Sequence, residues 1–132
     1  MQLTPLEAAV LRKVLAGDHP VLAALRQQLS GLTASTRKLT GVGFFTELTV
    51  ADTCSPAAIA VGIPPFGAVA ATIDGLAHGA GFVLFVKDGL IAMLEGYSYD
   101  EPWPERIEGF SLAYWHADRT AELAKLDRAP AP

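Results

Sequence analysis

The sequence predicts a single α+β domain, in which an N-terminal αα-hairpin packs on one face of a mostly antiparallel sheet of about five to six strands. Two observations predict this class. Leucine and valine recur at helical spacing within residues 1–31. Over residues 32–116, short segments rich in threonine, valine and aromatic residues alternate with turn residues. Helices followed by hairpin-connected strands are typical of α+β domains. Residues 117–132 form a tail.

The first helix has a well-marked start. Thr4 is a good N-cap, Pro5 suits the first helical position, and Glu7 completes a capping box with Thr4. Gly17 stands where a left-handed residue would end the helix. Five residues form its apolar stripe: Leu6, Val10, Leu11, Val14 and Leu15.

A second helix follows at once. Asp18 or His19 can cap it, Pro20 begins it and Gly31 ends it. Because so few residues join the two helices, we expect them to form an αα-hairpin whose apolar faces need another surface. The apolar positions of the second helix are Val21, Leu22, Leu25 and Leu29.

The period then changes to that of strands. The Asp88-Gly89 pair between two apolar runs is the strongest hairpin signal in the chain. Residues 51–65 read as a long loop, either a lid or an excursion, in which 57–61 could form one helical turn. Residues 118–128 could form a short helix. The expected strands are 33–39, 43–50, 67–74, 81–87, 90–97 and 109–115.

Composition limits the partners. The net charge is −4, the pI is about 5.2 and no basic run exceeds two residues, which argues against nucleic acid. No apolar run approaches the ~20 residues that cross a bilayer, and the start lacks the pattern of a signal peptide. We therefore expect a cytoplasmic protein without a membrane partner. Only 18% of residues are charged and 51% are apolar, so a homodimer interface is also expected.

No metal or cofactor is expected. Cys54 is the sole cysteine, which excludes an intrachain disulfide and a cysteine-based metal site. The spacing of His19, His78 and His116 matches no compact metal motif. A site assembled in space from His78, His116 and Glu95 stays an alternative.

The first candidate site is the glycine-rich connection 74–81, which places His78 among three glycines. Glycines let a ligand approach the backbone, and His78 could supply a donor, an acceptor or a base, oriented by Asp74. The structural alternative is a connection with special backbone angles and a surface histidine. No lysine–serine end or helix follows, so this segment is not a phosphate loop.

The second candidate site is the segment 94–104, which is dense in aromatic and acidic groups. Tyr97, Tyr99 and Trp103 offer contact area at low entropic cost, and Asp100 lies among them. Alternatively, Trp103 between two prolines plugs the end of the sheet. Glu95 interrupts an apolar strand, either on the solvent face or as a buried carboxylate.

Three segments together carry a resemblance. Thr40-Gly-Val-Gly-Phe-Phe-Thr46, the stretch 75–82 and the segment 94–104, with the helix junction 17–20, resemble a group of small bacterial proteins of unknown function. The resemblance covers most of the chain. It implies a stand-alone bacterial cytoplasmic domain, and it transfers no catalytic residue.

Three hypotheses follow. The first is a non-enzymatic binding or interaction domain that could self-associate, and it rests on the charge-poor surface and the aromatic segment. The alternative is a small-molecule-binding protein or an enzyme, with a pocket around His78 and residues 97–104. There, His78 would be the acid or base and Glu95 or Asp100 its partner. The third is a structural or regulatory domain with no small-molecule site.

Overall fold

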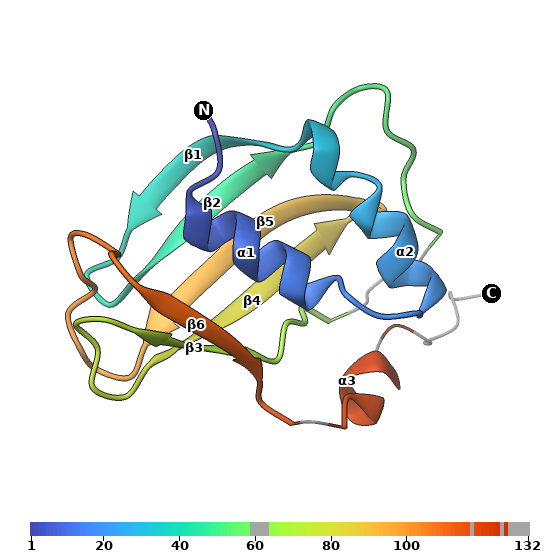
Figure 1. Ribbon diagram of the computed structural model, residues 1–132. Coiled ribbons are helices and arrows are strands. Elements are labelled where there is room, and N and C mark those ends of the chain that lie inside the picture. Colours follow the sequence, from blue (N-terminus) through green and yellow to red (C-terminus); the bar gives the residue numbers. More distant parts are fainter. Residues whose placement is uncertain (59–63, 117, 125, 127–132) are drawn as a thin grey trace.

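The computed structural model describes residues 1–58, 64–116, 118–124 and 126. Over these residues, three α-helices and a 3₁₀ turn accompany one six-stranded antiparallel sheet, with strand order β1-β2-β5-β4-β3-β6 (Figure 1). The predicted α+β class with an antiparallel sheet is therefore confirmed. The elements are α1 Pro5–Val14, α2 Pro20–Arg26, η1 Leu29–Gly31, β1 Thr33–Leu39, β2 Gly43–Thr49, β3 Val69–Ile73, β4 Ala80–Lys87, β5 Leu90–Ser98, β6 Phe110–Tyr114 and α3 Thr120–Ala124.

Helix α1 lies across one face of the sheet, with α2 beside it (Figure 1). Its predicted cap is present, because the Thr4 hydroxyl accepts from the Glu7 N–H and the Glu7 carboxylate accepts from the Thr4 N–H. The whole predicted stripe of α1 is buried in the core, together with inward residues such as Leu84 and Leu94 of the central strands. None of the helices in the described ranges is long and apolar enough to cross a bilayer.

The predicted hairpin joins β4 to β5, the two central strands of the sheet. Asp88 and Gly89 both have positive φ, +54° and +79°, as a type I′ turn requires. The apolar run 82–86 pairs with β5 on one side, and on the other side Leu84 bridges to Phe66. All six expected strands form, with ends that differ by at most two residues from the expected ones.

The second helix is shorter than predicted. It ends at Arg26, and a 3₁₀ turn at Leu29–Gly31 replaces its last part, so Gly31 does not end an α-helix. The reason is tertiary. The Gln28 side chain turns into the core, where its amide donates to Gly89 O and accepts from the Ile91 N–H. The predicted αα-hairpin is therefore present only in part, because its second α-helix is short and ends in a separate 3₁₀ turn.

The segments between and after the strands agree with expectation where the structure describes them. Residues 52–54 form a turn, and the irregular segment that follows places the Ala57 N–H on Gly89 O at 2.8 Å. The expected helical turn at 57–61 falls largely outside the described residues. In the tail, α3 spans Thr120–Ala124, which lies within the expected range 118–128. Residues 125, 127 and 128 of that range lie outside the described residues.

Arg119 clamps the C-terminal end of α1. Its guanidinium donates to Val14 O at 3.0 Å and Ala16 O at 2.6 Å, covers the ring of Tyr114 and pairs with Glu122. The bond to Val14 O satisfies a carbonyl of the last helical turn, and the bond to Ala16 O holds the chain just beyond α1. Arg119 therefore holds the tail on the body together with Leu123 and Leu126, which pack on the core.

Arg119→Ala is expected to lower the free energy of unfolding by about 2 kcal/mol, because charge-assisted bonds to buried carbonyls are lost. Urea unfolding measures the change. Arg106→Ala, at an exposed edge position, is the matched control. Equal effects of the two variants would contradict the role of Arg119.

Candidate functional site

The three candidate segments meet at one end of the sheet. Gly43 pairs with Tyr97 across β2 and β5, and the Trp103 N–H donates to Gly41 O at 2.8 Å. The carboxylate of Glu101 reaches the connection 76–79. Segments 40–46, 75–81 and 94–104 therefore lie close together in space, although their side chains point to different surfaces of the molecule.

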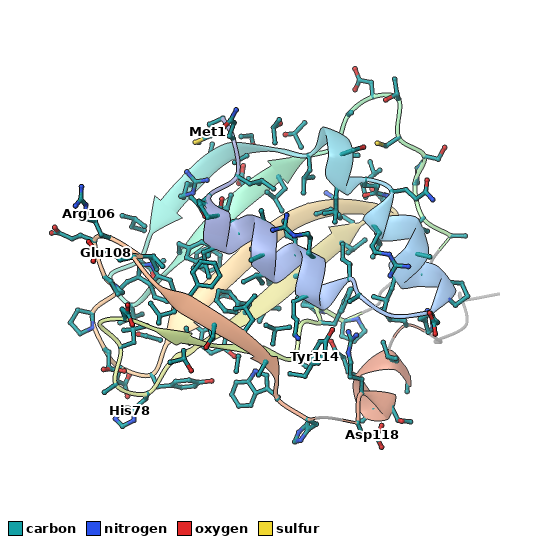
Figure 2. All side chains as sticks on the ribbon, viewed as in Figure 1. Met1, His78, Arg106, Glu108, Tyr114 and Asp118 are labelled. Carbon is teal, nitrogen blue, oxygen red and sulfur yellow. The ribbon has the colours of Figure 1, made fainter. Side chains whose placement is uncertain are left out.

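His78 is exposed, and its side chain points away from the body of the molecule (Figure 2). The carboxylate beside it belongs to Glu101, which accepts from the backbone N–H groups of Ala77 and His78 at 2.8 and 2.9 Å. These two backbone bonds hold the pKa of Glu101 below its ordinary value. Asp100 is exposed at a turn with φ +62°. The hollow that His78 borders does not include residues 97–104.

The aromatic segment divides between the two faces of the sheet. Tyr97 and Tyr99 lie on the face without helices, where Tyr99 makes edge-to-face contacts with Tyr97 at 5.8 Å and Trp115 at 6.2 Å. The ring of Tyr97 covers Gly81, where a Cβ would lie 2.5 Å from the phenol oxygen. Glu95 is half-buried on this same face.

Trp103 lies on the helix side. Its ring packs edge to face on Phe44, with centroids 5.5 Å apart. It lines a cavity of about 410 Å³ between the start of α1, the end of β1 and the segment 103–110. We call this cavity the α1 pocket. Its walls are Thr4, Pro5, Leu6, Glu7, Arg37, Leu39, Gly41, Phe44, Trp103, Pro104, Glu105, Ile107 and Phe110.

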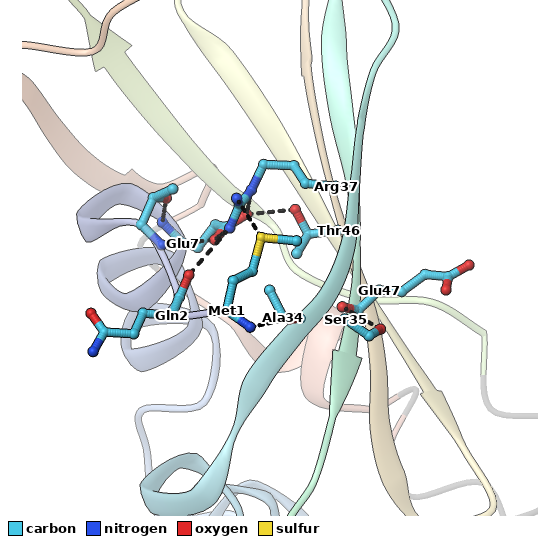
Figure 3. A network of polar contacts seen from close by, with 9 residues as sticks. Met1, Gln2, Glu7, Ala34, Ser35, Arg37, Thr46 and Glu47 are labelled. Carbon is cyan, nitrogen blue, oxygen red and sulfur yellow. Dashed lines mark hydrogen bonds and ion pairs between the residues drawn. The ribbon is translucent and has the colours of Figure 1, made fainter.

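A polar network on α1, β1 and β2 forms one wall of the α1 pocket (Figure 3). Arg37 pairs with the carboxylate of Glu7 through two bonds, Nε to Oε2 at 2.9 Å and Nη2 to Oε1 at 2.6 Å. The Thr46 hydroxyl donates to the same carboxylate. Glu7 is 1% exposed, and each of its oxygens has two donors, because the Thr4 N–H completes the set.

The network keeps both charges in place. Burial alone would raise the pKa of Glu7, but the hydrogen bonds from Arg37, Thr46 and Thr4 outweigh it and the pKa lies below its ordinary value. The bond to Glu7 likewise raises the pKa of Arg37. The pair is therefore ionised and internally neutralised.

Sequence reasoning missed this network. It identified Glu7 only as part of a capping box and gave Arg37 no role. Strict alternation from the buried Ala34 would place Arg37 on the outer face. A β-bulge between Ala34 and Thr36 shifts the register by one residue and turns Arg37 toward Glu7.

The fold and the α1 pocket define a small α+β domain with an apolar cavity above a half-covered sheet. Comparison with protein-family models, with curated proteins and with solved structures found no match. Within the described residues, no group of three histidine, cysteine, aspartate or glutamate side chains lies close enough to hold a metal ion.

Proposed function

We propose that this protein binds a small, uncharged and largely apolar molecule in the α1 pocket. The observation that carries the proposal is the cavity of about 410 Å³, whose walls are mostly aromatic and aliphatic. That volume lies within the range of roughly 300–1,000 Å³ that is common for ligand sites. A few convergent polar groups in an apolar cavity are the usual composition of such sites.

The charges of the pocket favour a neutral ligand. Two of the three guanidinium nitrogens of Arg37 are taken by Glu7, and both oxygens of Glu7 are fully used. A ligand carboxylate would find only Nη1 of Arg37 outside this ion pair, and it would lie close to the Glu7 carboxylate, which carries the same charge. Glu105, the other charged residue of the walls, is exposed.

The aromatic walls favour a ligand with a ring. Trp103 and Phe44 already meet edge to face, and Phe110 borders the same cavity. Further rings gain from edge-to-face or offset contacts with such groups. Because Trp103 is held by its backbone bond to Gly41 O, its ring is positioned before a ligand arrives.

Titration with N-phenyl-1-naphthylamine, a neutral dye with a naphthyl and a phenyl group, tests the proposal. We expect saturable fluorescence enhancement and a raised melting temperature, because a ligand that prefers the folded state stabilises it. Leu39→Asp, at a wall position that is 70% exposed, should weaken binding at least 10-fold without unfolding the protein. Ile107→Trp should occupy the cavity and have the same effect.

The matched control is Val42→Asp, since Val42 is a 46% exposed aliphatic residue in the same hairpin but outside the walls. It should bind the dye as the wild type does. If Leu39→Asp and folded Ile107→Trp both bind as tightly as the control, the α1 pocket is not the site. No saturable binding to the wild type would reject a neutral aromatic ligand.

A further inference from the structure

The face of the sheet opposite α1 is unusually apolar. In an antiparallel sheet with one wet face, outward positions are normally polar. Helices α1 and α2 cover only the other face (Figure 1). Within the described residues, β2, β5 and β4 present five large, partly buried and mainly apolar side chains to this face, beside charged residues such as Glu47 and Glu95: Phe45, Val83, Phe85, Met93 and Tyr97.

One row across this outer face carries two opposite charges. Phe45 of β2 is paired with Lys38 of β1 on one side and with Glu95 of β5 on the other. Neighbouring strands lie about 4.8 Å apart, so the two charges flank Phe45 at about 10 Å from each other along the sheet. No ion pair among the described residues uses Lys38 or Glu95.

We propose that two copies of this chain pack outer face to outer face about a two-fold axis that runs along β2 and passes Phe45. Such an axis lies between the two sheets and reverses their strand order, so β1 of one protomer faces β5 of its partner. Phe45 then meets its own copy, and Lys38 of each protomer lies opposite Glu95 of the other. Two-fold interfaces are self-complementary in this way.

The charge pattern favours a second copy as the occupant. A two-fold through Phe45 converts one unpaired cation and one unpaired anion per chain into two intermolecular pairs. About this axis β1, β2 and β5 of the two protomers overlap, so Phe45, Met93 and Tyr97 supply the apolar contacts, while Val83 and Phe85 of β4 lie beyond the overlap. Glu47, two residues along β2, is exposed and would face its own copy near the axis. Glu47 therefore lies over the axis beside Phe45, and the repulsion between its two copies is offset by the two Lys38–Glu95 pairs and by the contact between the Phe45 rings.

Charge reversal tests the pairing. Sedimentation velocity of the full chain should show a dimer. Lys38→Glu and Glu95→Lys should each raise the dimer dissociation constant at least about 10-fold, because each variant places like charges opposite each other twice. The double variant K38E/E95K should restore dimerisation, since it exchanges the two charges. Glu108→Lys, exposed and away from this face, is the control.

Circular dichroism shows whether each variant is folded. A wild type that stays monomeric at high protein concentration would overturn the proposal, as would single variants that dimerise like the control. A double variant no better than the single ones would overturn the Lys38–Glu95 pairing and its two-fold axis. The test of dimerisation does not depend on the proposed function of the α1 pocket. Dye binding is measured separately on the same variants, so failure of one proposal can be distinguished from failure of the other.

Discussion

Glu7→Ala is expected to lower the free energy of unfolding by about 3–5 kcal/mol, the range seen when one partner of a buried ion pair is removed. Glu7 is 1% exposed, and its carboxylate is the shared acceptor of Arg37, Thr46 and the Thr4 N–H. Its loss leaves these donors facing an apolar interior. Urea unfolding at neutral pH measures the effect.

Two control variants separate the ion pair from the helix cap. Thr4→Ala removes only the cap and should cost about 1 kcal/mol. Glu108→Gln neutralises an exposed carboxylate and should change stability by less than about 0.5 kcal/mol. If Glu7→Ala were no more destabilising than Thr4→Ala, the network around Arg37 would contribute nothing to stability.

The same network has a pH signature. The pKa of Glu7 is lower in the folded protein than its ordinary value of 4.5, so the folded state binds the proton less readily than the unfolded state. This stabilisation is complete above pH 4.5 and is lost as the pH falls from there through the lowered folded pKa. The pKa of Glu101 is lowered as well, so Glu101 also contributes to the loss of stability at low pH. The contribution of Glu7 is therefore the difference in the free energy of unfolding between wild type and Glu7→Gln, measured at each pH. Parallel stability curves below pH 4.5 would contradict it.

Gln28→Ala is expected to cost about 2–4 kcal/mol. The Gln28 side chain is fully buried and satisfies Gly89 O and the Ile91 N–H, which flank the β4–β5 hairpin. Alanine removes the Gln28 acceptor of the Ile91 N–H and one of the two donors to Gly89 O, and it opens a cavity. Thermal and urea unfolding measure the loss.

The neighbouring glutamine provides a matched control. Gln27 is exposed, so Gln27→Ala should stay within about 0.5 kcal/mol of the wild type. A second reading comes from hydrogen exchange, in which the Ile91 amide should lose protection in Gln28→Ala alone. Similar stabilities for the two variants would show that Gln28 does not hold the hairpin.

Local chemistry made much of the fold predictable. The start of α1 follows from Thr4, Pro5 and Glu7, which act within one turn of helix. The β4–β5 hairpin follows from Asp88-Gly89, because few residue pairs accept positive φ twice. In both places, the deciding interactions join residues close in sequence.

The candidate site was less predictable. The aromatic segment 94–104 was singled out correctly as a place where large side chains gather, but Trp103 and Tyr97 serve opposite faces of the sheet. The end of α2 was misplaced because Gln28 prefers partners 61 and 63 residues away. Hydrophobic spacing carries no information about such partners.

The sequence by itself determined the class of fold, the order of the elements and the buried stripe of α1, because periodicity and caps depend on short-range sterics and hydrogen bonds. Only the tertiary structure decided that Glu7 and Arg37 form one wall of the α1 pocket and that Lys38 and Glu95 flank Phe45. A single bulge in β1 sets which faces of the sheet Arg37 and Lys38 occupy. Strand register joins residues distant in the chain, so no local pattern could contain it.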